Sequence, residues 1–177
     1  MNEIQSKRKA RILSSASFTI PGTFAIVGGA YWAGIGAITT ELSASEQIAF
    51  SLRWLVVAII PYASVCIYIL QSRLNEGAHN PIEDKPSVTL AIHCRVMQNH
   101  LEQFVWFGTC LVALASLLHS NELHLVPILA VYFCLARFIY WWGYLQEGTT
   151  GRRYGVQMTF SVTIPLLLGV LGLVVFR

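Results

Sequence analysis

Five long apolar stretches constrain the fold of this chain more than any other feature of its sequence. They lie at about 12–40, 48–71, 88–118, 123–145 and 154–176. A helix that crosses the hydrocarbon core of a bilayer needs roughly 20 mostly apolar residues. Only helices and closed barrels satisfy every backbone polar group in lipid, and these stretches are too long for barrel strands. The sequence therefore predicts an all-α membrane protein with five transmembrane spans.

The composition supports a membrane protein and excludes several other classes. Of the 177 residues, 55% are hydrophobic and 12% are charged, about half the usual charged share of a soluble domain. The net charge of +3 is small, and no basic patch is interleaved with aromatic residues, so no nucleic-acid partner is expected. The cysteines show no metal-binding spacing and are expected to be small buried hydrophobes, so no metal site is predicted.

The basic residues of the loops predict the orientation of the spans. Eight of them fall on one side: Lys7, Arg8, Lys9, Arg11, Arg73, Lys85, Arg152 and Arg153. The loops on the other side, 41–47 and 119–122, contain no Lys or Arg. The positive-inside rule then predicts a cytoplasmic N-terminus and a C-terminus on the opposite side. A cleaved signal peptide is the alternative for the first span, but its apolar part is longer than a typical signal.

Polar residues in the third span share one face of a helix. Arg95, Asn99 and Glu102 lie within about 60° of one another at 100° per residue, whereas His100 points well away from them. Ionisable residues in a membrane helix usually face the bundle interior or a wet cavity. This face is predicted to bind a polar ligand. The alternative is that Arg95 and Glu102 form interhelical ion pairs with a purely structural role.

A second polar face is predicted on the fourth span. Arg137, Tyr140 and Tyr144 fall within about 60° on a helix, and a loop with two arginines follows. Because the third span begins and the fourth ends on the same side, the two polar faces are expected at similar depth. They would then converge on one site. The aromatic residues of the fourth span are also consistent with an interfacial aromatic belt.

These two motifs resemble those of the MAPEG family, membrane-associated proteins in eicosanoid and glutathione metabolism. R-x-x-x-N-x-x-E in the third span resembles its first motif, and RFIYWWGYLQEGTTGRR resembles its second. The resemblance covers about residues 55–177. It implies a four-helix transmembrane bundle of MAPEG type in 48–177, preceded by a basic N-terminus and one extra transmembrane helix in 1–47. Such an added helix is similar to the mattrin-like branch of the family.

The extra first span is predicted to pack closely against another helix. Its small residues Gly29, Ala33 and Ala37 are spaced four apart, a pattern that lets membrane helices approach one another. No chemistry of its own is expected for this span.

The resemblance also implies a ligand and the residues that hold it. MAPEG proteins are typically homotrimers that bind glutathione between protomers near the cytoplasmic face. The glutathione-binding residues implied here are Arg73, Arg95, Asn99, Glu102, Arg137, Tyr140 and Tyr144. Arg153, nine residues after Tyr144, would be the catalytic arginine that stabilises the thiolate. The sequence departs from the family at Met97, where many members have histidine, and at Gln157, where a tyrosine is frequent.

The implied function is that of a glutathione transferase or peroxidase that conjugates or reduces a lipophilic electrophile or peroxide in the membrane. The charges of glutathione, two carboxylates and an ammonium, complement a cationic pocket that contains one carboxylate. The alternative is a non-catalytic MAPEG-fold protein that binds lipid or regulates another membrane protein. A transporter or channel is a further alternative, although no inverted repeat is readable in the sequence.

Overall fold

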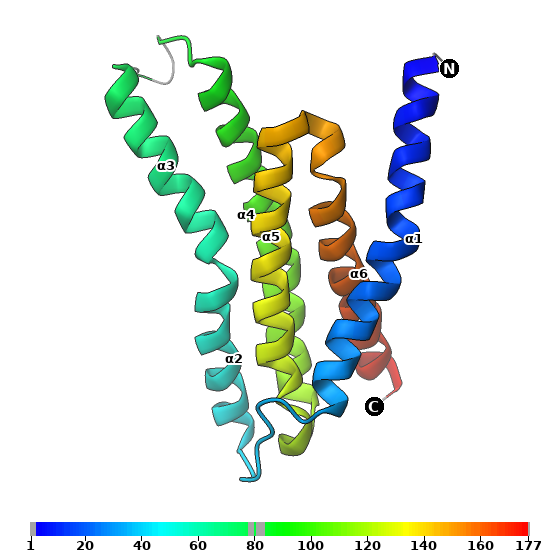
Figure 1. Ribbon diagram of the computed structural model, residues 1–177. Coiled ribbons are helices and arrows are strands. Elements are labelled where there is room, and N and C mark those ends of the chain that lie inside the picture. The colour runs from blue at the N-terminus through cyan, green and yellow to red at the C-terminus, as the bar shows by residue number, and fades with distance from the viewer. Residues whose placement is uncertain (1–2, 78–79, 81–83, 177) are drawn as a thin grey trace.

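The computed structural model describes residues 3–77, 80 and 84–176, and every regular element in this part is a helix (Figure 1). The elements are α1 (Glu3–Trp32), α2 (Ala44–Ala58), α3 (Ile60–Glu76), α4 (Val88–Leu117), the short 3₁₀ helix η1 (Ser120–Glu122), α5 (Leu125–Gly151) and α6 (Arg153–Phe176). The described part contains 5 helical segments long and apolar enough to cross a membrane, with α2 and α3 forming one of them. The predicted all-α fold of an integral, multi-pass membrane protein is thereby confirmed.

The first span ends earlier than the apolar pattern predicted. Gly34 and Gly36 follow α1 with φ of 65° and 77°, a left-handed backbone conformation that terminates the helix. Ala33 and Ala37 therefore lie beyond α1, and a Cβ built on Gly29 would meet nothing within 4 Å. The close helix packing predicted for these small residues is wrong, because the pattern assumed a helix that continues past Gly34.

Instead, α1 is attached to α5 and α6 by polar contacts at separate depths. The hydroxyls of Thr23 and Tyr132 lie 2.6 Å apart between α1 and α5. Near the start of α1, Gln157 Nε2 of α6 donates to the carbonyl of Ile12 at 2.9 Å and to Ser15 Oγ at 2.9 Å. The extra helix thus packs against the outside of α5 and α6 (Figure 1).

The centre of the bundle is α5, the most buried of the candidate spans. In the most apolar 18-residue stretch of this span 61% of the residues are buried, against 11% in the corresponding stretch of α1. It packs against α1, α2, α4 and α6. Phe133 of α5 stacks on Phe107 of α4 with ring centroids 4.2 Å apart, and neither ring is more than 1% exposed. Several polar residues of α5, Arg137 among them, are therefore buried inside the packed bundle.

The turn from α5 into α6 is built on glycine. The backbone leaves helical geometry at Glu147 and at Gly148, where φ is 60° and ψ is −133°. A Cβ on Gly151 would overlap the carbonyl of Gly143, and a Cβ on Gly155 would overlap the backbone of Tyr140. The chain therefore folds back so tightly that the start of α6 lies directly against α5.

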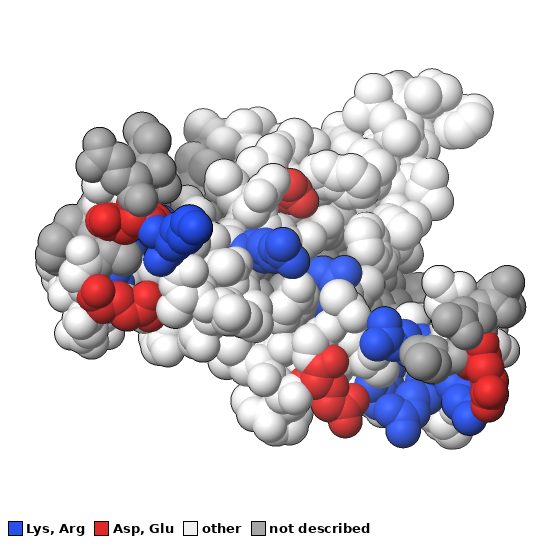
Figure 2. All heavy atoms as spheres, turned by 90° about the horizontal axis from the view of Figure 1, so that it is seen from above, with Lys and Arg blue, Asp and Glu red and all other residues white. Residues whose placement is uncertain are grey.

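One end of the bundle is basic. At this end lie the start of α1, the end of α3, the start of α4 and the turn between α5 and α6 (Figure 1). Viewed onto this end, Lys and Arg side chains cluster at one edge and continue across the surface (Figure 2). The loops at the other end carry no Lys or Arg over 33–43 and 118–124. The membrane side on which each end lies stays a prediction.

Candidate functional site

The candidate site is centred on Arg137, a buried arginine halfway along α5. Its side chain is 2% exposed. Its Nη2 donates to Asn99 Oδ1 at 2.7 Å, and its Nη1 donates to Thr159 Oγ1 at 3.3 Å. Within the described residues no carboxylate lies within 4.0 Å of this guanidinium. A buried charge is costly unless it is paired, so Arg137 has a charge that the described chain leaves uncompensated.

His100 is the second buried partner of Arg137. Its Nδ1 lies 2.7 Å from Arg137 Nη2, and its side chain is 1% exposed. Arginine only donates hydrogen bonds, so Nδ1 accepts and a neutral ring carries its proton on Nε2. That Nε2 is buried and has no hydrogen-bond partner among the described residues. The helical wheel correctly put His100 away from Arg95, but the direction in which it points is the interior of the bundle.

Two tyrosines connect Arg137 to a second arginine, Arg152. The Arg137 guanidinium lies over the Tyr140 ring, 4.2 Å from its centroid. The Tyr140 hydroxyl accepts a hydrogen bond from Arg152 Nη1 at 3.0 Å, and Arg152 also lies 5.3 Å from the centroid of Tyr144. We call this group the polar layer; its members are Asn99, His100, Arg137, Tyr140, Tyr144, Arg152 and Thr159. Its two cations face aromatic and neutral polar groups.

Arg153 is not part of the polar layer. Its Nη1 donates to the carbonyl of Thr150 at 2.9 Å and lies 3.5 Å from Glu147, while its guanidinium stacks on Tyr154 at 4.4 Å. It lines a cavity together with residues of α1. The structure thus brings Arg152, and not Arg153, to the two tyrosines. These contacts do not test the catalytic role predicted for Arg153, which stays a prediction.

The remaining predicted residues lie on the outer side of α4 and at the end of α3. Arg95 and Glu102 are exposed on α4, whereas Asn99 between them is half-buried and reaches Arg137. Gln98 Nε2 donates to Glu102 Oε1 at 3.2 Å. Arg95 and Glu102 form no ion pair with each other or with another described residue, so the interhelical ion pair of the structural alternative is not seen within one copy. Arg73 lies in the last turn of α3 at the basic end.

Sequence reasoning missed His100, Arg152 and Thr159. For His100 a signal existed, because a residue opposite an outward-facing polar stripe must point into the bundle. For Arg152 no sequence signal was sufficient, since adjacent arginines differ by about 100° on a helix and the glycine turn decides which one faces inward. For Thr159 no sequence signal existed, because nothing in the sequence distinguishes it from any other small polar residue of a membrane helix.

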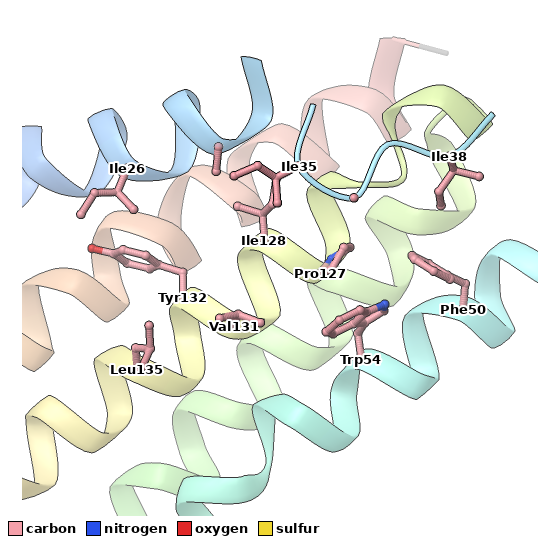
Figure 3. A pocket seen from close by; sticks show the side chains of 12 residues that line it. Ile26, Ile35, Ile38, Phe50, Trp54, Pro127, Ile128, Val131, Tyr132 and Leu135 are labelled. Atoms are coloured by element: carbon pink, nitrogen blue, oxygen red, sulfur yellow. The ribbon is translucent and has the colours of Figure 1, made fainter. Parts of the chain in front are cut away.

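A separate apolar cavity lies toward the opposite end of the bundle, between α1, α2 and α5 (Figure 3). Its volume is about 470 Å³. The labelled side chains converge on it from α1 (Ile26), from α2 (Phe50 and Trp54) and from α5 (Val131 and Leu135). None of its lining residues is charged, so this cavity suits a hydrocarbon chain and offers nothing to bind an anion.

Together, the five spans and the buried cationic layer define a polytopic α-helical membrane protein with a polar site inside its bundle. The sequence pattern of the MAPEG family matches residues 51–172, more than half of the chain, and the protein belongs to the MAPEG family. It is 28% identical over 125 residues to Transmembrane protein 79 of Bos taurus. The match covers 70% of this chain but 31% of that relative, so the chain spans about a third of the relative's length. No solved structure matches the chain.

Proposed function

We propose that the protein binds glutathione between adjacent copies of a homotrimer, and that it conjugates or reduces a lipophilic electrophile or peroxide delivered from the bilayer. The polar layer and the outer face of α4 would form the binding site together. The basic end of the bundle would face the cytoplasm, where glutathione is available.

The observation that carries this proposal is an exposed carboxylate in the middle of a membrane helix. Glu102 lies 14 residues after the start of α4, which is about 21 Å along the helix axis. A carboxylate exposed at such a depth is costly in lipid and cannot reach water along its own helix. A neighbouring copy or a polar ligand that covers α4 would remove this cost. On the inner side, an anionic group of the ligand at the same depth would neutralise the uncompensated charge of Arg137.

The residues present fit the charges of glutathione. Arg137 and Arg152 lack a carboxylate among the described residues and would accept the two carboxylates or the thiolate of the tripeptide, while Glu102 would accept its ammonium. When bound, glutathione supplies a thiol that reacts as a nucleophile or as a reductant. Arg152 and the Tyr140 hydroxyl would stabilise negative charge on its sulfur, because both can donate hydrogen bonds into a site of low dielectric.

The proposal is tested by glutathione binding and by turnover of an aryl halide in detergent. We expect Glu102→Gln to weaken glutathione binding at least about tenfold, because a hydrogen bond to a charged group contributes about 1.5–3 kcal/mol. Glu122→Gln removes the same charge from η1 at the opposite end and should leave binding unchanged. Undetectable binding to the wild-type protein at millimolar glutathione would reject the proposal.

A second candidate function is favoured by the apolar cavity in Figure 3. A non-catalytic member of the family that binds lipid would need such a cavity, and a volume of about 470 Å³ is sufficient for a hydrocarbon chain. Under this alternative, the protein purified from membranes would carry a lipid lost in Trp54→Ala, and it would show no glutathione turnover.

A further inference from the structure

A cationic cavity lies where the extra helix α1 meets the turn between α5 and α6. Its volume is about 550 Å³. It is lined by Ala10, Arg11, Ser14, Ser15, Phe18, Glu147, Arg153 and Tyr154. Arg11 comes from α1, which precedes the part of the chain matched by the family pattern, and Arg153 comes from the start of α6. This cavity therefore exists only because α1 is present.

The charges around the cavity favour an anion. Two arginines face a single carboxylate, Glu147, which lies 3.5 Å from Arg153. Arg11 is exposed and forms no ion pair or hydrogen bond with another described residue. The Nε of Arg153 is buried and likewise lacks a hydrogen-bond partner in the described part of the chain. The hydroxyls of Ser14 and Tyr154 add neutral donors beside the two guanidinium groups.

The cavity also has an apolar side that a soluble anion would not need. Phe18 forms this side, and its side chain is 77% exposed. It lies seven residues after Arg11, so it reaches about 10 Å further along α1. Because α1 becomes continuously apolar in this direction, a ligand that enters beside Phe18 has hydrocarbon around its lower part. The cavity thus has a cationic part at Arg11 and Arg153 and an apolar part at Phe18, further along α1.

From this arrangement we infer that the cavity binds the phosphate headgroup of an anionic phospholipid, with Arg11 and Arg153 on the phosphate and an acyl chain along Phe18. Phosphate is a preferred partner of arginine because the planar guanidinium donates two parallel hydrogen bonds to it. Such a lipid would hold α1 against the rest of the bundle.

This inference is independent of the proposed glutathione site, because it concerns a cavity outside the polar layer and another arginine of the turn. Arg152 faces Tyr140 and Tyr144, whereas Arg153 faces α1. A protein that binds no glutathione would still bind this lipid, and a protein that binds glutathione need not. Lipid retention, measured without glutathione, therefore tests this inference separately from the proposed function.

The experiment uses the full chain in nanodiscs of phosphatidylcholine with one fifth phosphatidylserine, followed by native mass spectrometry of the released protein. We expect wild type to retain phosphatidylserine preferentially. Arg11→Gln should lower this preference about tenfold, because it removes a charge-assisted pair of hydrogen bonds to the phosphate inside the cavity. Arg8→Gln is the matched control, because it removes the same charge from α1 at a position that does not line the cavity.

Arg153→Gln should lower the preference by a similar factor, and Arg153→Lys should restore only part of it, because the charge remains but the planar pair of donors is lost. Arg153 also contacts Glu147 and Thr150, so Arg153→Gln can fail to fold. In that case the comparison of Arg11→Gln with Arg8→Gln decides the test. An equal loss in Arg11→Gln and Arg8→Gln, or no preference in wild type, would overturn the inference. Inorganic phosphate at millimolar concentration should not displace the lipid; displacement would show a site for free anions and overturn the lipid assignment.

Discussion

At the scale of single residues, two adjacent arginines have separate environments. Arg152 donates to the Tyr140 hydroxyl at 3.0 Å, and Arg153 contacts Thr150 and Tyr154 on the other side of the turn. Spacing from Tyr144 pointed to Arg153, but spacing along a sequence counts residues and carries no information about a kink between them. The inward direction of Arg152 depends on the left-handed Gly148.

This difference leads to a prediction about glutathione turnover. Arg152→Ala should lower kcat/KM about a hundredfold, the loss typical of a donor to developing negative charge. Arg153→Ala should lower it much less, and Arg152→Lys should keep part of the activity because the charge remains. Steady-state kinetics of the three variants in one detergent provide the comparison. A larger loss for Arg153→Ala would support the role that the family resemblance implies.

At the scale of elements, the apolar pattern predicted where spans exist better than where helices change direction. The third and fifth spans, expected at 88–118 and 154–176, correspond to α4 (Val88–Leu117) and α6 (Arg153–Phe176). The interruption at Ile59 between α2 and α3 was not predicted, because it is short and lies within the apolar stretch 48–71. Gly148 was expected in a loop after residue 145, whereas the structure has it at a kink inside α5, which continues to Gly151. Hydropathy detects the length of a span and is insensitive to a local change in backbone direction.

The glycine turn makes a testable contribution to stability. Gly155→Ala would place a methyl group against the backbone of Tyr140, and overpacking of this kind typically costs about 1–3 kcal/mol. Denaturant unfolding followed by tryptophan fluorescence should show a lower midpoint for this variant. Gly172→Ala, also in α6 but with nothing within 4 Å of its Cβ position, should unfold at or above the wild-type midpoint. Equal midpoints for both variants would contradict the close packing of the turn.

At the scale of the whole molecule, the charges divide into an inner and an outer group on the two sides of α4. His100 and Asn99 reach Arg137 inside the bundle, whereas Arg95 and Glu102 face outward. A single copy leaves both groups incomplete, because the inner cations lack a carboxylate in the described chain and the outer charges face lipid. Association of copies through α4 would cover the outer charges, and the inner cations would still need an anionic ligand.

The protein is therefore expected to be a trimer in mild detergent. Native mass spectrometry should give about three times the chain mass of 19.7 kDa. Glutathione at a hundredfold excess over its Kd should stabilise this assembly against thermal unfolding by about 2.7 kcal/mol. Dilution to monomers should abolish the stabilisation, since the site would then be incomplete. Glutathione-dependent stabilisation of a pure monomer would show that one copy suffices.

The sequence by itself determined the class of the protein and its five spans. These properties depend on the total apolar length of each segment and on helical periodicity, both of which are local. The tertiary structure decided which arginine faces the tyrosines, that His100 contacts Arg137, and that α1 forms a cavity with Arg153. These depend on how glycines and kinks orient one helix against another, and no local pattern encodes such contacts between distant segments.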